Sequence, residues 1–457
     1  MSFGKAVDQQ SAKMTGYNFL KTEGVQADLS SMSMVYKATS TVKGESVTDF
    51  YVFNTGAKGF VIVSGDDNVA PVLAYSDDDN FRPDNIPASV SDWLNNYKNQ
   101  VNYVIEQKMQ ATEQTAIQWA NLQSPTMKSA AKTTSVTIVT PFVTTKWDQA
   151  GYYNKLCPFD ATADTNVLTG CVATAMAQVM RYWKWPVTGY DMHTYSSSYG
   201  SLSANFGATT YSWDSMPNSV TKTNNHVATI MLQAGISVDM NYGVDASGAF
   251  VTQSSSPKKN CAEYALKTYF KYKASTMKGL SRYSYSDNDW VQMVKDDITA
   301  KRPVIYTGAG ADGGHAFIAD GYTTGDKIHI NWGWGGYYNG YYLLSALHPG
   351  SSTFDDNQTI IIGITPDNPI ALGVTETITA TESAIYPNPA KDVLHVDLKG
   401  INTTSISLAD MQGRTLKTIT PANKTLVTIH VSDLSAGIYI LSVQTERGVT
   451  TKKVVIE

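Results

Sequence analysis

The chain has only three cysteines, Cys157, Cys171 and Cys261, in 457 residues. Three thiols cannot form a disulfide framework, and no C-x-x-C pair or Cys/His ligand spacing accompanies them. We therefore expect no structural zinc and no other metal, and nothing in the sequence suggests a cofactor. Each cysteine has to be interpreted from its own surroundings.

Long apolar runs are also missing. No stretch approaches the ~18 uninterrupted apolar residues of a transmembrane helix. Residues 1–8 lack the charged and apolar regions of a signal peptide. Either the protein stays inside the cell, or the numbered chain begins after a removed signal.

Charged residues are scarce. They make up 16% of the chain, below the ~25% typical of soluble domains, and the formal net charge is −5. This balance gives no reason to expect nucleic acid or an anionic membrane as a partner. Ser, Thr, Asn, Gly and 27 tyrosines fill the deficit, a pattern common in exported proteins.

Two polar stretches divide the chain. The first, at 123–135, has a proline and few large apolar residues, so we predict an exposed, cleavable linker there. The second, at 367–384, is rich in threonine. We therefore expect domains at 1–130, 131–366 and 385–457.

The first and last domains differ in their periodicity. Strands are predicted at 50–53, 59–64 and 71–75, followed by a helix at 91–105, which indicates an α+β domain. The last domain consists of short alternating segments with glycines at the turns. This pattern predicts a small antiparallel β-sandwich.

A helix is predicted to begin near Cys171. Thr169 is the expected N-cap, and Pro186 ends the pattern. In the first turn of a helix, free N–H groups and the positive end of the dipole favour thiolate over thiol. A reactive thiolate and a small buried core cysteine are both compatible with this stretch. The apolar residues at helical spacing are Val172, Met176, Val179 and Trp183.

The other two cysteines have less informative surroundings. A helix predicted at 259–272 places Cys261 on an apolar side, so this thiol is most simply a core residue. Cys157 precedes Pro158 in a predicted loop, and nothing else marks it as functional.

Among seven histidines, His315 has the surroundings best suited to a base. A thiol that attacks an amide carbonyl needs a base for its proton, commonly histidine. Gly313 and Gly314 precede His315 and allow a substrate to pass close to the imidazole, and an apolar strand follows. A structural histidine at the start of a strand is the alternative.

Asn331 is the candidate for orienting that imidazole. The distance in sequence leaves room for one strand, a turn near 323–326 and a return strand, so an antiparallel pair is expected to place His315 and Asn331 side by side. An asparagine carbonyl that accepts the imidazole N–H fixes its tautomer. Trp332 is expected to cover that bond from water, although packing alone also explains a tryptophan here.

Gln149, upstream of the cysteine helix, is a candidate oxyanion donor. Its amide, together with the backbone N–H of Cys171, is able to donate to the negative charge that develops on a carbonyl oxygen. One glutamine before one cysteine is weak support by itself.

The order of these motifs resembles that of papain-like cysteine peptidases, and more narrowly the streptopain family, over roughly residues 20–366. Cys171 lacks the Cys-Gly-Ser-Cys-Trp surroundings of papain, so the specificity of papain is not expected here. The similar segments are 169–182 around the cysteine, 235–243, Gly313-Gly-His315-Ala-Phe and Asn331-Trp332-Gly-Trp-Gly-Gly.

The resemblance implies an α+β fold. A papain-like two-lobed catalytic domain, with a helical lobe and an antiparallel β lobe, would follow an α+β inhibitory prodomain. The implied roles are Cys171 as nucleophile, His315 as general base and acid, Gln149 as oxyanion donor, Asn331 as orienter and Trp332 as its shield.

The resemblance also implies how the enzyme is used. Family members are endopeptidases that favour an apolar residue second upstream of the cut bond. Cleavage in the linker near 124–136 would release the mature enzyme from its propeptide. The candidate substrate-pocket residues are Tyr242, Gly248, Gly313 and Gly314.

The last domain resembles a type IX secretion sorting domain. The resemblance implies export across a bacterial outer membrane, with the secretion machinery as a partner and a secreted or surface-attached product. It also implies that the numbered chain starts after a removed signal. The motifs that carry it are Ile385-Tyr-Pro-Asn-Pro, Asp410-Met-Gln-Gly-Arg414 and Leu434-Ser-Ala-Gly-Ile-Tyr.

Three functions follow as hypotheses. The first is a secreted cysteine endopeptidase zymogen that acts on proteins and peptides, with its own propeptide as intramolecular inhibitor. The second is a catalytically silent surface binding or adhesion protein on the same scaffold, against which the intact Cys171 and His315 argue. The third is an acyl-transfer enzyme such as a transglutaminase or deamidase, whose sites usually have an aspartate where this chain has Asn331.

Overall fold

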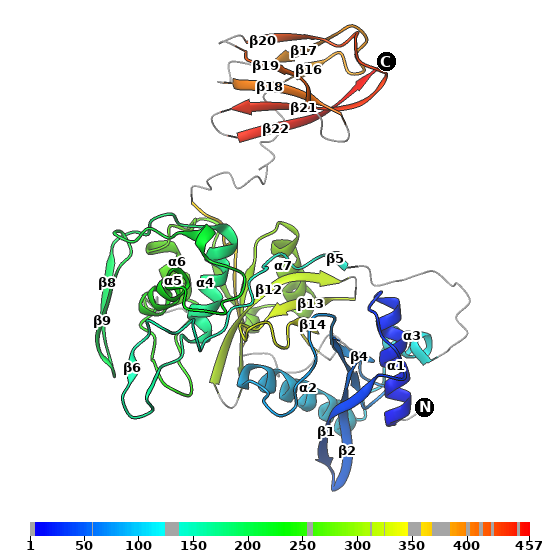
Figure 1. The fold of residues 1–457 in the computed structure, drawn as a ribbon. Coiled ribbons are helices and arrows are strands. Elements are labelled where there is room, and N and C mark those ends of the chain that lie inside the picture. The colour runs from blue at the N-terminus through cyan, green and yellow to red at the C-terminus, as the bar shows by residue number, and fades with distance from the viewer. Residues whose placement is uncertain are drawn as a thin grey trace. The chain divides into compact units, whose positions relative to one another are not determined.

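The computed structural model describes residues 5–56, 58–123, 137–253, 259–310, 313–323, 325–345, 358–367, 384–398, 403–410, 415–421, 425–445 and 448–457. The chain forms two compact units, Met1–Asn368 and Pro369–Glu457 (Figure 1). The predicted linkers at 123–135 and 367–384 lie almost entirely outside the described residues.

The first part of unit 1 is an antiparallel meander with helices on both faces. Strand β3 shows the reason, because Phe60 and Ile62 face the core that includes α2, while Val61 and Val63 face the core that includes α1. The elements are α1 (Gln9–Thr22), β1 (Ser33–Val42), β2 (Glu45–Asn54), β3 (Phe60–Ser64), β4 (Val72–Ser76), α2 (Ala88–Gln107) and α3 (Glu113–Gln123).

The elements predicted in this part are confirmed. The strands expected at 50–53, 59–64 and 71–75 are β2, β3 and β4, and the helix expected at 91–105 is α2. The apolar stripe of α2 faces the sheet, which is why its periodicity was visible in the sequence. Strand β1 and helix α1 were not predicted.

One sheet runs through the whole of unit 1. It joins the two parts where β4 pairs with β14, with Tyr341 opposite Tyr75 and Tyr342 opposite Ala74. The backbones come so close that a Cβ on Gly340 would lie 2.5 Å from the carbonyl oxygen of Tyr75. The strand order is β1-β2-β3-β4-β14-β13-β12-β11-β15-β10, with β5 beside β12.

The strands of the second part form the β lobe. α7 (Asp287–Thr299) covers the sheet face that α2 also covers, through Trp290, Val294 and Ile298. The strands are β5 (Thr137–Val139), β10 (Lys278–Ser281), β11 (Val304–Gly310), β12 (Gly313–Thr323), β13 (Lys327–Asn331), β14 (Gly340–Leu343) and β15 (Thr359–Ile362).

The helical lobe packs against the other face of these strands. Its core joins α4 (Cys171–Trp183), α5 (Asn225–Ile236) and α6 (Ala262–Thr268) to Ile305, Ala316 and Ile318 of the sheet. Two hairpins complete the lobe, β6 (Phe159–Asp160) with β7 (Thr165–Asn166), and β8 (Met192–Ser197) with β9 (Gly200–Asn205). The expected α+β architecture with two lobes is confirmed (Figure 1).

The helix predicted at 259–272 is shorter than expected. Cys261 precedes α6 in extended backbone, with φ −144° and ψ 161°, and is fully buried, as predicted for a core residue. Cys157 is also buried, and burial raises the pKa of its thiol to about 12. Neither thiol is set up as a nucleophile.

Unit 2 is the predicted antiparallel β-sandwich. One sheet has the order β16-β17-β20 and the other β19-β18-β21-β22, and their inner side chains share one core. The strands are β16 (Ala384–Tyr386), β17 (Val393–Asp397), β18 (Thr403–Ala409), β19 (Thr415–Ile419), β20 (Leu426–His430), β21 (Gly437–Thr445) and β22 (Gly448–Ile456).

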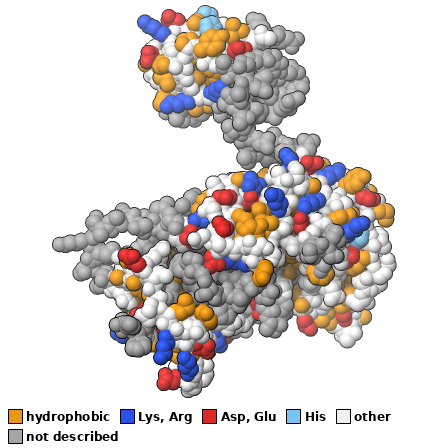
Figure 2. Space-filling model, turned by 180° about the vertical axis from the view of Figure 1, so that it is seen from behind, with side chains coloured by type: hydrophobic (Ala, Val, Ile, Leu, Met, Phe, Trp, Pro, Cys, Tyr) orange, Lys and Arg blue, Asp and Glu red, His pale blue; other side chains and the backbone are white. Residues whose placement is uncertain are grey.

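Charged side chains of both signs are interspersed on the face shown in Figure 2. This mixture fits a chain with 35 cationic and 40 anionic residues. In the part of the chain that the structure describes, no helix has both the length and the apolarity needed to cross a bilayer. The same residues contain no cluster of three or more His, Cys, Asp and Glu side chains suited to a metal ion.

Candidate active site

Helix α4 begins at Cys171, as the apolar spacing predicts, but its cap differs from the expectation. The N-cap is Gly170, whose φ of 86° is in the left-handed region, where a Cβ would be strained and would lie 2.7 Å from the sulfur of Met240. Thr169, the predicted cap, instead shares a hydrogen bond of 2.9 Å with the hydroxyl of Thr174. The first turn therefore keeps its N–H groups clear of side-chain caps.

The pKa of the Cys171 thiol lies above its ordinary value. The side chain is buried, and burial raises its pKa more than the backbone N–H groups of Ala316 and Val172 lower it. This direction is opposite to the one expected from the helix N-terminus alone. The amide of Ala316 donates to Sγ at 3.4 Å, which joins residues 145 positions apart in sequence.

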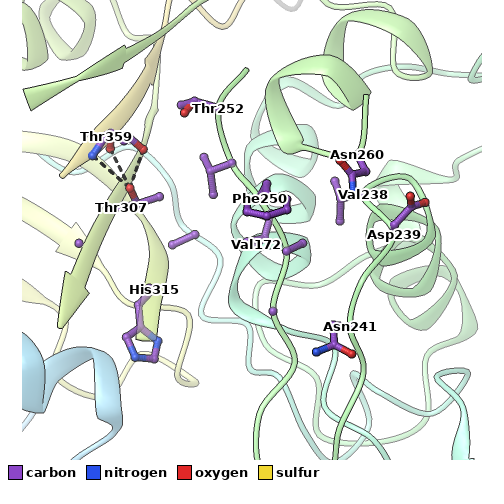
Figure 3. A pocket seen from close by; sticks show the side chains of 16 residues that line it. Val172, Val238, Asp239, Asn241, Phe250, Thr252, Asn260, Thr307, His315 and Thr359 are labelled. Atoms are coloured by element: carbon purple, nitrogen blue, oxygen red, sulfur yellow. Dashed lines mark hydrogen bonds between the residues drawn. The ribbon is translucent and has the colours of Figure 1, made fainter. Parts of the chain in front are cut away.

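His315 comes within one residue of that contact, but its side chain faces elsewhere. Side chains alternate along β12, so Ala316 and Ile318 face the helical lobe while His315 and Phe317 face α2. The imidazole Nε2 lies 3.6 Å from the carboxylate of Asp92 on α2. Figure 3 shows the ring extending from its strand towards that helix.

Asn331 lies at the end of β13, as expected, but not beside His315. The β12–β13 register places Asn331 opposite Ile318, so its side chain shares the face of Ile318 and meets α4. Its Nδ2 donates to the carbonyl of Thr145 at 2.7 Å, and its Oδ1 accepts from the amide of Gly333 at 3.1 Å. The expected side-by-side arrangement is absent from this state, because the register differs by three residues.

Trp332 is almost fully buried on the α2 face. Its ring lies 4.6 Å from that of Phe317 and 5.9 Å from that of Trp93, so packing is its evident role in this state. The expected role of Trp332 as a shield for Asn331 stays a prediction, because the two side chains lie on opposite faces of the sheet in this structure.

Gln149 has an amide donor with nothing to bind. The residue is 3% exposed, and its Nε2 has no acceptor among the described residues. A buried N–H group without a partner is rare, and this donor is available to an acceptor on a substrate. The carbonyl of Gln149 accepts from the amide of Thr169 at 3.0 Å, which fixes the backbone two residues before Cys171.

A cavity of about 580 Å³ lies between the two lobes beside His315 (Figure 3). Gly248 and Gly314 are among its lining residues, whereas Tyr242 is buried in the helical-lobe core. The surroundings of Gly313 lie outside what the structure describes. The wall is largely apolar, and Thr307 and Thr359 hydrogen-bond to each other at one side. The apolar lining consists of Val172, Val238, Ala249, Phe250, Val251 and Ala316.

Two residues near the site had no signal in the sequence. Asp92 is one polar position in an amphipathic helix, and nothing local shows that it meets His315. Gln178, on α4, contacts Asn331 and was hidden within an otherwise apolar helical pattern. Both act across contacts that depend on the tertiary fold.

Three family comparisons match separate parts of the chain. Residues 147–342 match the Peptidase C10 family, and residues 4–101 match the Spi protease inhibitor. Residues 384–457 match the secretion system C-terminal sorting domain.

Individual relatives agree with these matches. Thiol protease/hemagglutinin PrtT of Porphyromonas gingivalis is 30% identical over 86% of this chain, which spans 46% of PrtT. Streptopain of Streptococcus pyogenes is 28% identical over 79% of this chain and 92% of streptopain. A solved fragment of prointerpain A from Prevotella intermedia is 30% identical, with a TM-score of 0.55, over 72% of this chain and 99% of the fragment.

Proposed function

Because the chain belongs to the Peptidase C10 family, the streptopain family, we propose that it is a secreted cysteine endopeptidase made as an inactive zymogen. The observation that carries the proposal is the contact of the Cys171 sulfur with the strand of His315, through the amide of Ala316 at 3.4 Å. The alternative of a silent binding protein has no support among relatives that are themselves thiol proteases.

The proposed reaction uses five side chains. His315 takes the proton of the Cys171 thiol, and the sulfur forms a bond to the carbonyl carbon of the substrate. The oxyanion accepts from Gln149 Nε2 and the backbone N–H of Cys171. The C–N bond then breaks as His315 returns the proton to the amine, and a water activated by His315 hydrolyses the thioester. Asn331 orients the imidazole and Trp332 shields that contact.

Latency is assigned to the domain at 1–130. Asp92 faces His315 at 3.6 Å, so the imidazole contacts the prodomain. Activation then requires the end of β12 to move, because His315 must pass from the α2 face to the face of Cys171. The match of residues 4–101 to a protease inhibitor supports this role.

Contacts around α2 hold the prodomain on the peptidase domain, which we place at 131–366. Trp334 Nε1 donates to the hydroxyl of Ser89 at 2.9 Å, and Tyr97 donates to the carbonyl of Leu343 at 2.6 Å. The guanidinium of Arg82 lies 3.6 Å from the ring centre of Tyr337. The loop that follows Asn331 is thus clamped until the linker near 124–136 is cut.

The cavity beside His315 is the proposed pocket for the substrate residue second upstream of the cut bond. Its apolar wall favours an apolar side chain. The hydroxyls of Thr307 and Thr359 hydrogen-bond to each other, so they need no polar partner from the substrate. Gly248 and Gly314 allow the substrate backbone to come close.

The sorting domain directs the chain to the cell surface or the extracellular space by type IX secretion. The linker at 367–384 separates this domain from the peptidase in our proposal. Protein and peptide substrates are then met outside the cell, and the secretion machinery is the partner of residues 385–457.

Incubation of the purified full chain tests the proposal. We expect the wild type to shorten by cleavage near 124–136 and then to bind a thiol-directed epoxide inhibitor at Cys171. Cys171→Ala should stay full length, and Cys261→Ala is the matched control because that thiol is buried in the core. Normal maturation of isolated Cys171→Ala would contradict the assignment.

A further inference from the structure

Gln178 is a fully buried amide on the helix that begins at Cys171. It lies two helical turns after the cysteine, so the two side chains share one face of α4. A buried carboxamide costs free energy unless its donors and acceptor are used. The helix therefore keeps a polar group whose partners have to be found across the fold.

Those partners belong to the segment before Gln149 and to the end of β13. Gln178 Oε1 accepts from the amide of Trp147 at 3.3 Å and from Asn331 Nδ2 at 3.4 Å. Its Nε2 donates to Asn331 Oδ1 at 3.5 Å. One side chain thus joins the backbone just before Gln149 to the side chain of Asn331.

Backbone groups of fixed polarity decide how both amides point. The N–H of Trp147 only donates, so the oxygen of Gln178 must face it. The carbonyl of Thr145 only accepts, so the nitrogen of Asn331 must face it. Neither amide is free to flip, and Asn331 Oδ1 keeps one defined direction.

We propose that Gln178 is a positioning residue for the reaction. It fixes Asn331 and the segment that leads to Gln149 relative to the helix of Cys171. The orienting residue, the oxyanion donor and the nucleophile therefore keep constant positions relative to one another. The inference rests on the proposed function, in which Asn331 orients His315. Gln178 itself lies behind the site and does not touch the substrate.

The test compares Gln178→Met with wild type after maturation. Met fills the space without hydrogen bonds, so we expect kcat to fall about tenfold or more while KM stays within about twofold, because the reacting groups lose alignment. The apparent pKa of the acidic limb of the pH–activity profile should rise by about half a unit or more. The reason is that a poorly oriented imidazolium stabilises the thiolate less. Met176→Leu, on the same buried helix, should change neither.

A double variant shows whether Gln178 acts through Asn331. We expect Gln178→Met to add little in an Asn331→Ala background, because the partner is already gone. An unchanged kcat and pH profile for Gln178→Met, or losses that multiply fully in the double variant, would overturn the inference. If Gln178→Met gives no folded protein, Gln178→Glu keeps the shape and both acceptor contacts, loses the donor, and is expected to shift the same limb.

A readout without catalysis separates this inference from the proposed function. A wild-type chain that never cleaves or labels would refute the peptidase assignment alone. In that case the same pair of substitutions is measured by denaturant unfolding of Cys171→Ala. Non-additive changes in the unfolding midpoint of the double variant would support the link between Gln178 and Asn331. Additive changes would contradict that link.

Discussion

At the residue scale, the proposed nucleophile and the proposed base each contact a named neighbour. Burial raises the pKa of the Cys171 thiol, and the amide of Ala316 donates to its sulfur at 3.4 Å. Asp92 faces the imidazole of His315 from the prodomain. Two separate restraints mean that the loss of either one alone leaves the other in place.

The first prediction concerns the reactivity of Cys171. Because its pKa is raised in the zymogen, the thiolate fraction at pH 7 is smaller than for a free cysteine. We expect iodoacetamide to label Cys171 slowly in the zymogen, with a rate that is still rising above pH 9. Maturation should speed labelling at pH 7 by about tenfold or more. Equal rates before and after cleavage would contradict this view of the buried thiol.

The second prediction concerns Asp92. Asp92→Asn removes the charge that faces His315 but keeps the size of the side chain, so we expect the full chain to mature several-fold faster. Glu106→Gln, at an exposed position of the same helix, is the control for charge on α2. Band intensities on a gel, followed over time at several protein concentrations, give the rate. A time course that matches the wild type would show that Asp92 does not restrain the base.

The third prediction concerns Lys327, a buried lysine of β13 that lies over the ring of Phe19 in α1. Burial lowers its pKa from 10.5 to about 8, although Glu23 and Asp326 oppose the shift. The unfolded chain therefore binds more protons than the folded chain between these values, so Lys327 makes stability rise with pH there.

The measurement is the unfolding free energy of Cys171→Ala at pH 7 and pH 9. We expect Lys327→Met to remove a gain of roughly 1 kcal/mol that Lys327 contributes between the two pH values. Lys295→Met serves as a comparison, because Lys295 pairs with Asp326 on the same side of the fold. If the unfolding free energy has the same pH dependence with and without Lys327, the pKa of this lysine is not lowered in the folded chain.

At the element scale, α2 does more than complete the prodomain. Trp93 on this helix meets Tyr306, Phe317 and Trp332 edge-on, with ring centres 5.7 to 6.1 Å away. The helix therefore packs on the same strand, β12, that carries His315. The packing of α2 on β12 and the orientation of the His315 imidazole therefore depend on each other.

The fourth prediction is that Trp93→Ala weakens the packing of α2 on β12. Removal of a buried tryptophan costs about 3–5 kcal/mol, here mostly at the contact with the peptidase domain. We expect faster maturation than for Trp119→Ala, whose ring is buried in the other core and bonds the carbonyl of Val69. Equal acceleration by both variants would point to general unfolding of residues 5–123 and away from α2.

Local patterns were enough to predict the elements that position the candidate site. The helix of Cys171, the strands around His315 and Asn331 and the terminal sandwich all follow from apolar spacing, because each buries one face against a core. The β12–β13 register and the α2 contact did not follow, because a shift of a few residues leaves the local pattern intact. Thr169 failed as a cap since the backbone there needs the left-handed glycine beside it.

At the scale of the molecule, unit 2 has a hydrophobic core built from its own strands. The fifth prediction is that residues 384–457 unfold cooperatively as an isolated domain. A chain that ends at 368 should mature at the wild-type rate within about twofold and keep its melting temperature. A clear loss of stability in the shortened chain would show that the two units support each other.

The β4–β14 pairing determines whether β14 is an interior strand or an edge strand of the sheet. In the zymogen β14 is an interior strand with partners on both sides. If the prodomain leaves, as we propose, β14 becomes an edge strand whose amide and carbonyl groups on that side lose the partners that β4 supplies. We therefore expect the mature enzyme to be more prone than its precursor to associate through this edge of the sheet.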